Sequence, residues 1–285
     1  MIEYEADTKH ADIIIAEMGL EKGSKGVEAP IEKEVVEEGA RQGDEEKEED
    51  LMDQAEAKKF RAVAARANYL SLDRPDIQYT AKEICKHMAR PRKRHWAKPK
   101  RLARYLLMYP RLVWRFMNEA NVGEEYLEVF SDSDWAGDRV TRRSTSGGMA
   151  VLAGGLLKSW SSTQGTVAMS SGEAEYYAMV KAAAEALAIQ ALAKDLGYSM
   201  KIRLWVDSTA AKAIVSRIGL GKIRHMEVKY VWAQEAHKIG RFEVRKVHGT
   251  RNPSDINTKP KTASEMADLL EKAGSWLDEL ARVRC

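Results

Sequence analysis

Two carboxylates follow directly on a predicted strand near the middle of this 285-residue chain. Residues 126–130 have the aromatic and β-branched side chains of a strand, which runs into Asp132 and Asp134 before a Gly-Asp turn. Taken alone, an Asp-x-Asp pair at a strand end more often only solvates a turn. Carboxylates at comparable positions further along the chain make a metal site the better interpretation.

Those further carboxylates lie in three other predicted elements. Glu173 and Glu175 are in the first turn of a long helix, and Asp207 ends a strand. Asp255 follows in a loop rich in Gly, Pro and Asn. Strand carboxyl ends are where open α/β folds bind ligands, so we expect these acids to meet at one edge of a sheet.

Acids brought together in this way would repel one another unless cations neutralised them. Hard oxygen ligands with no cysteine and one nearby histidine, His248, favour Mg²⁺ or Mn²⁺ over Zn²⁺. Two such ions about 4 Å apart would polarise a phosphodiester, activate a water and stabilise the leaving oxygen. The residue types therefore predict two-metal phosphodiester chemistry.

The pattern of apolar residues and turns predicts an α/β fold. Three strands with tight links form an antiparallel meander, and a long helix, two further strands and shorter helices follow. The order is βββ-α-β-α-β-α, a mixed five-stranded sheet with helices packed on it. The predicted strands are 126–132, 145–153, 156–161, 202–207 and 242–247, and the predicted helices of this half are 170–196, 208–216, 227–237 and 264–283.

The first 120 residues have a different character. Residues 1–20 predict a short amphipathic helix, and residues 21–50 are rich in acids with almost no aromatics, which predicts a disordered linker. Helical periodicity resumes at residue 55 and again after Pro75. The N-terminal part is therefore expected to be a helical region preceded by an acidic linker.

Charge is segregated along the chain, although its formal net value is only +3. Between Lys86 and Arg115 there are eleven Lys and Arg and no acid. Basic residues interleaved with aromatics suit a groove that follows a nucleic-acid backbone, but an ordinary helix pair with a basic exterior fits as well. The candidate nucleic-acid-binding residues are Arg92, Lys93, Arg94, Trp96, Lys100, Arg101 and Arg104, together with Ser208 beside Asp207.

Cysteine usage and the chain's apolar segments indicate an intracellular protein. Cys85 and Cys285 are the only cysteines, which excludes a disulfide framework and a cysteine-based zinc site. The first residues lack the apolar core of a secretory signal. The most apolar helical stretch is interrupted by Lys181 and Glu185, so we expect a core helix and no membrane span. Cytoplasm and nucleus are not distinguished.

Several motifs in order resemble the ribonuclease H domain of copia-type retrotransposon Pol polyproteins. They span residues 124–262 and are specific in sequence and spacing. The segments that carry the resemblance are Ser131-Asp132-Ser133-Asp134-Trp135-Ala136-Gly137, Arg142-Arg143-Ser144-Thr145-Ser146-Gly147, Ser159-Trp160-Ser161-Ser162, Ser170-Ser171-Gly172-Glu173-Ala174-Glu175-Tyr176, Val206-Asp207-Ser208 and Asp255-Ile256-Asn257-Thr258-Lys259-Pro260.

This resemblance implies a ribonuclease H-like fold and a two-metal site that cuts the RNA strand of RNA/DNA hybrids. The implied metal ligands, which are also the catalytic acids, are Asp132, Glu175, Asp207 and Asp255. His248 matches a loop histidine that helps proton transfer or product release, although a plain surface histidine is as compatible. The family usually has Phe where this chain has Asn257, which weakens the packing expected after Asp255.

The choice between neighbouring acids rests on two arguments. Glu175 matches the motif because an apolar pair and Ala follow it, and Glu173 lies about 200° away around the helix. Only one of the two can face the metals. Asp134 points the same way as Asp132 but is expected beyond the strand end, so Asp132 is the predicted ligand.

Upstream segments resemble the end of a copia-type reverse transcriptase. Arg74-Pro75-Asp76-Ile77 and His95-Trp96 are among the matching segments, whereas no Tyr-x-Asp-Asp motif occurs. The resemblance implies a fragment of Pol that has no polymerase activity and whose expected partner is the remainder of the Pol polyprotein. The implied division is a palm remnant at 1–20, a linker at 21–50, a thumb and connection remnant at 51–120, and the ribonuclease H-like domain at 121–285.

The leading hypothesis is an endoribonuclease that acts on RNA/DNA hybrids with two Mg²⁺, or Mn²⁺. A catalytically inactive retroelement remnant that binds nucleic acid is the main alternative, and the retained acids argue against it. An integrase-like nuclease shares the chemistry but fits the element order less well.

Overall fold

The computed structural model describes residues 2–21, 23–33, 50–116, 126–219 and 225–277. They form two compact units, a sheet unit and a helical unit. The sheet unit is built mainly on Trp114–Lys259, with Leu269–Ser275, and the helical unit on Tyr4–Val113, with Pro260–Asp268. Most of the predicted acidic linker, residues 34–49, lies outside the described residues.

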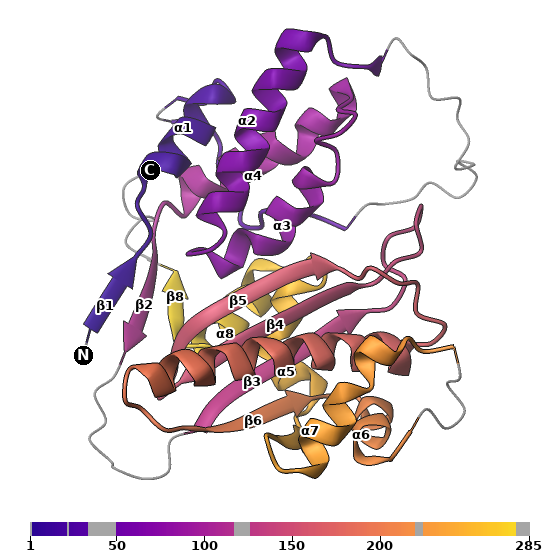
Figure 1. Ribbon diagram of the computed structural model, residues 1–285. Helices are drawn as coiled ribbons and strands as arrows, with labels where there is room; N and C mark the ends of the chain where they lie inside the picture. The colour runs from indigo at the N-terminus through magenta and orange to yellow at the C-terminus, as the bar shows by residue number, and fades with distance from the viewer. Residues whose placement is uncertain (1, 22, 34–49, 117–125, 220–224, 278–285) are drawn as a thin grey trace. The chain divides into compact units, whose positions relative to one another are not determined.

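The sheet unit contains a five-stranded mixed sheet with the order β5-β4-β3-β6-β7 (Figure 1). Strands β3, β4 and β5 pair antiparallel, and β3 pairs with β6, and β6 with β7, in parallel. This is the mixed five-stranded sheet that the sequence predicts, three antiparallel strands followed by two more. Its strands are β3 (Tyr126–Asp134), β4 (Thr145–Leu152), β5 (Gly155–Thr163), β6 (Lys201–Val206) and β7 (Glu243–Lys246).

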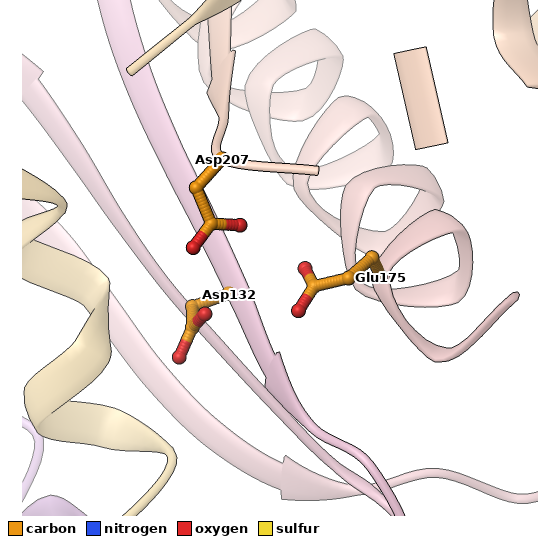
Figure 2. A group of neighbouring side chains, drawn as sticks. All are labelled: Asp132, Glu175 and Asp207. Carbon is orange, nitrogen blue, oxygen red and sulfur yellow. The ribbon is translucent and has the colours of Figure 1, made fainter. Parts of the chain in front are cut away.

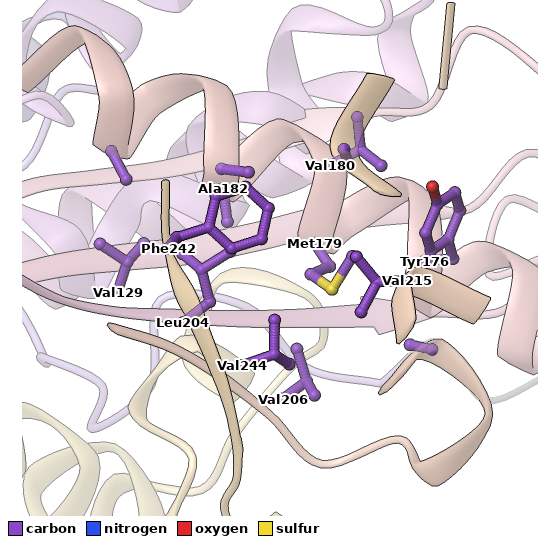
Figure 3. Close-up of a cluster of buried hydrophobic side chains, with 14 of the residues drawn as sticks. Val129, Tyr176, Met179, Val180, Ala182, Leu204, Val206, Val215, Phe242 and Val244 are labelled. Atoms are coloured by element: carbon purple, nitrogen blue, oxygen red, sulfur yellow. The ribbon is translucent and has the colours of Figure 1, made fainter. Parts of the chain in front are cut away.

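Helix α5 (Ser171–Asp195) packs against β3, β4 and β6 and supplies more of the sheet unit's core than any other element. The helix begins at Ser170, whose Oγ accepts a hydrogen bond from the Glu173 N–H at 3.2 Å. Figure 3 shows Met179 and Tyr176 of this helix on either side of Val215, and Val206 of β6 in the same cluster. The remaining helices of the unit are α6 (Thr209–Ser216) and α7 (Trp232–Lys238), with a 3₁₀ turn η3 (Val228–Tyr230).

Several boundaries differ from the sequence prediction, among them that of the predicted helix 227–237, which begins as the 3₁₀ turn η3 before α7. Strand β3 extends to Asp134, because Ser133 and Asp134 still pair with Ser146 and Thr145 of β4. The last helix, α8 (Ala263–Lys272), ends well before the predicted boundary near residue 283, since Gly274 adopts φ 77° and strand β8 (Ser275–Leu277) follows. Residues 278–285 of the chain, where the predicted helix would end, lie outside the described residues. Strand β1 (Ile2–Glu5) also precedes the predicted helix, α1 (Lys9–Glu17).

The helical unit consists of amphipathic helices packed through small and branched side chains. Its members are α1, α2 (Gln54–Leu70), α3 (Pro75–Cys85), the 3₁₀ turn η2 (Lys93–Trp96) and α4 (Ala97–Met108). Phe60, Ile77 and Leu102 are fully buried in this unit. Strand β2 (Leu112–Phe116) follows α4 and lies between β1 and β8 in a second, three-stranded sheet.

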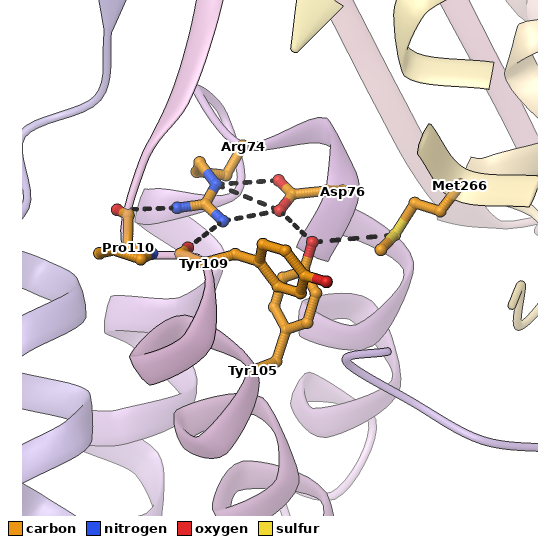
Figure 4. A network of polar contacts seen from close by, with 6 residues as sticks. All are labelled: Arg74, Asp76, Tyr105, Tyr109, Pro110 and Met266. Carbon is orange, nitrogen blue, oxygen red and sulfur yellow. Dashed lines mark hydrogen bonds and ion pairs between the residues drawn. The ribbon is translucent and has the colours of Figure 1, made fainter. Parts of the chain in front are cut away.

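A buried ion pair holds the helical unit together (Figure 4). Arg74 Nη2 lies 2.7 Å from Asp76 Oδ2, and the same guanidinium donates to the carbonyl oxygens of Tyr109 and Pro110. Tyr105 Oη donates to Asp76 Oδ2 at 2.8 Å. Burial, and next the charge of Asp76, raise the pKa of Tyr105. The network therefore joins the start of α3 to the end of α4. None of the helices in the described ranges is long and apolar enough to cross a membrane.

Candidate active site

Parallel pairing of β3 with β6 brings two acids side by side. The register pairs Ser131 with Val206, so the next residue of each chain segment is an aspartate, Asp132 and Asp207. In parallel neighbours, residues in register point to the same face of the sheet. Glu175 reaches the same place from the first turns of α5. Three elements that are far apart in sequence thus deliver one carboxylate each.

The three carboxylates form a compact group (Figure 2). Asp132, Glu175 and Asp207 each offer one oxygen, and these oxygens all lie within 4.8 Å of one another. Asp132 is buried, and the other two are half-buried. Burial and the charge of Asp255 raise the pKa of Asp132 to about 8. Burial and the charges of Asp132 and Asp207 raise the pKa of Glu175 to about 9.

Asp255, the fourth predicted ligand, lies beside this group and is held by a lysine. Lys259 Nζ lies 2.5 Å from Asp255 Oδ1, one helical turn further along the chain. Burial and the charge of Asp255 raise the pKa of Asp207. Burial opposes the charged form of Lys259, but its hydrogen bond to Asp255 and the other nearby aspartates raise its pKa. Lys259 therefore supplies positive charge at the edge of the acid group.

A short 3₁₀ segment positions Asp255. This segment, η5 (Pro253–Asn257), packs on β3, β4 and β5. Asn252 caps it and donates through Nδ2 to the carbonyl oxygen of Ser131 at 2.9 Å. Asn257 is fully buried and donates to the carbonyl oxygen of Gly148, so the amide bonds where a Phe would only pack.

Thr258 is a residue of the site to which sequence reasoning gave no role. Its Oγ1 donates to Asp132 Oδ2 at 2.5 Å, and both side chains are buried. Lys259 was likewise assigned no role. Both lie in the Thr258-Lys259-Pro260 part of the family motif, which was the available signal.

The chemistry of the donor set fits a divalent metal. The oxygens are hard ligands, and Glu175 Oε2 is buried without a hydrogen-bond partner among the described residues. A buried carboxylate oxygen without a donor is stabilised when a cation occupies the space beside it. Burial first, and then neighbouring acids, raise the pKa values of Asp132 and Glu175, and a bound cation would favour the charged form of both.

Asp134 and Glu173, the two neighbouring acids, have other partners. Asp134 Oδ1 accepts a hydrogen bond from the Thr145 N–H on β4. Glu173 is buried and accepts from Tyr177 Oη at 2.5 Å and from the Met169 N–H at 3.1 Å. His225 Nε2 also lies 2.9 Å from Glu173 Oε2. Both acids therefore fix backbone and side chains around the site.

His248 and Ser208 lie on segments that adjoin Asp207. Ser208 caps α6, its Oγ accepting from the Ala211 N–H at 3.2 Å. His248 is exposed, and its Nδ1 lies 2.9 Å from Thr250 Oγ1. A Cβ added to the next residue, Gly249, would lie 3.4 Å from Asp207 Oδ2, so the backbone of this loop passes close to the acid.

The predicted nucleic-acid-binding residues of the helical unit have varied surroundings. Arg92 is 3% exposed, whereas Lys93 and Lys100 are exposed. Arg101 Nε donates to the Ala29 carbonyl oxygen and its Nη2 lies 2.5 Å from Glu32. Arg94 Nη1 lies 3.7 Å from Asp50. Trp96 packs edge-on against Phe60, and Arg104 Nε donates a hydrogen bond to the Lys25 carbonyl oxygen.

Comparison with known proteins gives three informative relatives. The chain is 26% identical over 200 residues to the retrovirus-related Pol polyprotein from transposon TNT 1-94 of Nicotiana tabacum. It is 28% identical over 219 residues to that from transposon RE1 of Arabidopsis thaliana. These matches cover 70% and 75% of the chain, which spans 15% of the length of either polyprotein. It is also 37% identical over 126 residues to secreted RxLR effector protein 161 of Plasmopara viticola, covering 44% of the chain and 87% of that protein.

No protein-family model matches the chain. Among solved structures, RNase H1 of the archaeon Halobacterium salinarum is similar over 47% of the chain and 94% of its own length, with 20% identity and a TM-score of 0.34. The chain is similar over most of its length to retrovirus-related Pol polyproteins of plant transposons, which fits the copia-type resemblance of its motifs.

Proposed function

We propose that the sheet unit is an endoribonuclease that cleaves the RNA strand of RNA/DNA hybrids. The observation that carries this proposal is the group of buried Asp132 with half-buried Glu175 and Asp207, beside Asp255 and with one carboxylate oxygen left without a donor among the described residues. The Pol relatives support a role in the copying of a retroelement, where such hybrids arise. We further propose the remainder of a Pol polyprotein as a partner.

Two Mg²⁺, or Mn²⁺, are the proposed cofactors, with Asp132, Glu175, Asp207 and Asp255 as their ligands. When bound, such ions supply Lewis-acid activation of the scissile phosphate and of the attacking water. The chain's own residues orient the carboxylates: Thr258 fixes Asp132, and the η5 segment carries Asp255 to the group. Lys259 moderates the repulsion between the acids.

His248 is proposed to move a proton at the leaving or attacking oxygen. The loop that carries it passes beside Asp207, and its exposed ring can reach solvent. A histidine is the side chain whose ordinary pKa suits proton transfer near neutral pH. Its replacement by Ala would then lower the rate while metal binding is kept.

For the helical unit we propose a remnant of the reverse transcriptase thumb and connection that binds nucleic-acid phosphates. The exposed basic residues Lys93, Arg94 and Lys100 are the best candidates for these contacts, with Trp96 beside them in sequence. In the sheet unit, Ser208, next to Asp207, is proposed separately as a nucleic-acid contact. The residues proposed for the catalytic domain are 121–285, preceded by the thumb and connection at 51–120, the acidic linker at 21–50 and the palm remnant at 1–20.

The decisive experiment is cleavage of a labelled RNA/DNA hybrid by the purified full chain. We expect cutting of the RNA strand with Mg²⁺, none with chelator, and none of a DNA duplex of the same sequence, because only RNA supplies 2′-hydroxyls. The Asp132→Asn variant serves as the control for contaminating nuclease. Binding of the hybrid without cutting would favour the inactive, nucleic-acid-binding alternative, and equal cutting of the DNA duplex would favour an integrase-like nuclease.

A further inference from the structure

The loop between β3 and β4 begins directly after the strand that carries Asp132 (Figure 1). Its backbone is held by its own hydrogen bonds, most of them to Asp138. Asp138 Oδ1 accepts from the N–H groups of Val140 and Thr141, and its carbonyl oxygen accepts from the Arg142 N–H at 2.7 Å. The Asp138 N–H donates to the Arg143 carbonyl oxygen at 3.1 Å. The loop is therefore a preformed support for the side chains it carries.

Three arginines of this loop point their charge into solvent. Arg139, Arg142 and Arg143 are exposed, and none of them forms an ion pair or a side-chain hydrogen bond with another residue in the described part of the chain. Elsewhere in the sheet unit, Arg203 and Arg245 are paired with Glu128 or Glu243. Unpaired guanidinium groups on a fixed loop suit the bidentate binding of phosphate oxygens.

Exposed apolar side chains lie on the same loop and on the segment that its first residue contacts. Trp135, the first residue of the loop, is 52% exposed, and its Nε1 donates to the Ala168 carbonyl oxygen at 3.0 Å. The two residues that flank Ala168, Val167 and Met169, are 49% and 70% exposed. A fixed indole ring beside free arginines presents a face for a sugar or a base and donors for the adjoining phosphates.

Both parts of this surface are tied to the acid group. Trp135 follows Asp132 by three residues on the same chain segment. The Met169 N–H donates to Glu173, which lies two residues before Glu175 in α5. The Trp135 surface therefore lies on the chain segments that carry Asp132 and that lead into the helix of Glu175.

We propose that Trp135, Arg139, Arg142 and Arg143, with Val167 and Met169, form a platform that grips the sugar–phosphate backbone of the hybrid next to the scissile phosphate. The inference rests on the proposed function, because it assigns a substrate-binding surface to the same site. The ligand that fits the platform is a nucleic-acid duplex, because the platform combines positive charge with an aromatic face and carries no metal ligand.

The test compares two triple variants of the full chain. Arg139→Ala, Arg142→Ala and Arg143→Ala together remove the charges of the platform. Lys194→Ala, Lys238→Ala and Arg241→Ala together remove three exposed charges near the ends of α5 and α7, and serve as the matched control. Affinity for the RNA/DNA hybrid is measured at several salt concentrations in an Asp132→Asn background, and KM and kcat in the active background.

The platform variant is expected to bind the hybrid at least about tenfold more weakly at moderate salt. Its plot of log affinity against log salt should be shallower by roughly one unit for each phosphate group that the variant no longer binds. KM should rise while kcat is kept, because the metal ligands are unchanged. Trp135→Ala should weaken binding by about tenfold through the absence of stacking, with little change in salt slope. Thermal melting confirms that each variant is folded.

Equal affinity, KM and salt slope in the platform and control variants would show that these arginines do not bind the backbone of the hybrid, which would overturn the proposal. A wild-type protein that binds hybrid without cutting it would overturn the proposed function, while the binding comparison still decides the platform. A wild-type protein with no affinity for the hybrid would overturn both.

Discussion

Thr258 Oγ1 donates a hydrogen bond to Asp132 Oδ2 at 2.5 Å, joining residues 126 positions apart in the chain. Thr258 is fully buried, and Asp132 is 3% exposed. The bond occupies one carboxylate oxygen and fixes the plane of the group. Partners that orient a metal ligand in this way commonly affect metal affinity or activity by about 10–100-fold.

Replacing Thr258 by Val should therefore lower hybrid cleavage by about tenfold or more. The isosteric side chain keeps the packing but cannot orient Asp132. The Mg²⁺ concentration for half-maximal activity should rise, which a purely structural role would not cause. Thr258→Ser retains the hydroxyl and should recover most of the activity. Unchanged Mg²⁺ dependence in Thr258→Val would show that this bond does not position Asp132 for catalysis.

The two aspartates of β3 should respond differently to loss of charge. Asp132→Asn should abolish cleavage while leaving metal-free thermal stability equal or higher, because it removes repulsion between buried carboxylates. Asp134→Asn should retain most activity, since an amide oxygen can still accept from the Thr145 N–H. Cleavage assays and melting curves on both variants check this, and exchanged behaviour would mean that Asp134 is the metal ligand.

Local patterns predicted the strands and helices that carry the acids because those patterns depend on neighbouring residues. The sequence analysis expected the acids to meet at one edge of the sheet, but it did not predict the parallel register of β3 and β6 that places Asp132 beside Asp207. The contact between Thr258 and Asp132 was not predicted either, because it depends on how η5 packs on the sheet.

The basic stretch shows the other limit of sequence reasoning. Charge composition cannot say which cations have partners inside the fold. Arg101 and Arg104 bond to carbonyl oxygens of residues 25–29, more than 70 positions away, and Arg92 is buried. The unpaired arginines of the platform lie elsewhere, on the β3–β4 loop, where no run of charge marks them.

Gly147 is where η5 packs against β4, and a methyl group there should displace the site. A Cβ at this position would lie 2.9 Å from the Ser254 carbonyl oxygen and 2.6 Å from Thr258 Cγ2. Gly147→Ala should therefore lower cleavage strongly and reduce stability by about 1–3 kcal/mol. Gly165→Ala, with open space around its Cβ, is the matched control. Activities of both variants at wild-type level would mean that the η5 segment adjusts without moving Asp255.

The metal-free protein should lose stability as pH rises. The pKa of Asp132 is raised from 3.8 to about 8 and that of Glu175 from 4.5 to about 9, first by burial. Between roughly pH 4 and 9 the folded protein therefore binds more protons than the unfolded chain, so the free energy of unfolding falls as pH rises.

Melting temperatures in chelator at pH 5.5 and 8.5 measure this fall, which should be smaller in Asp132→Asn. Mg²⁺ should raise the melting temperature more at pH 8.5, where it does not compete with protons for the carboxylates. Identical pH dependence in the wild type and the variant would exclude these acids as its source.

The Arg74–Asp76 pair should dominate the stability of the helical unit. Both side chains are buried, and Arg74 also donates to the carbonyl oxygens of Tyr109 and Pro110. Arg74→Met leaves Asp76 as a buried charge with Tyr105 as its remaining donor, so we expect a loss of about 3–5 kcal/mol. The exposed pair of Arg111 with Glu5 is the control, and Arg111→Met should cost less than about 1 kcal/mol.

Chemical denaturation of both variants measures the difference, and a second pair of substitutions separates the effect of charge pairing from that of packing. Arg74→Met combined with Asp76→Leu removes the unpaired charge as well, so it should be more stable than Arg74→Met alone. Tyr105→Phe removes a single donor to Asp76 and should cost about 1–2 kcal/mol. If Arg74→Met were as stable as Arg111→Met, the network in Figure 4 would contribute no more than a surface ion pair.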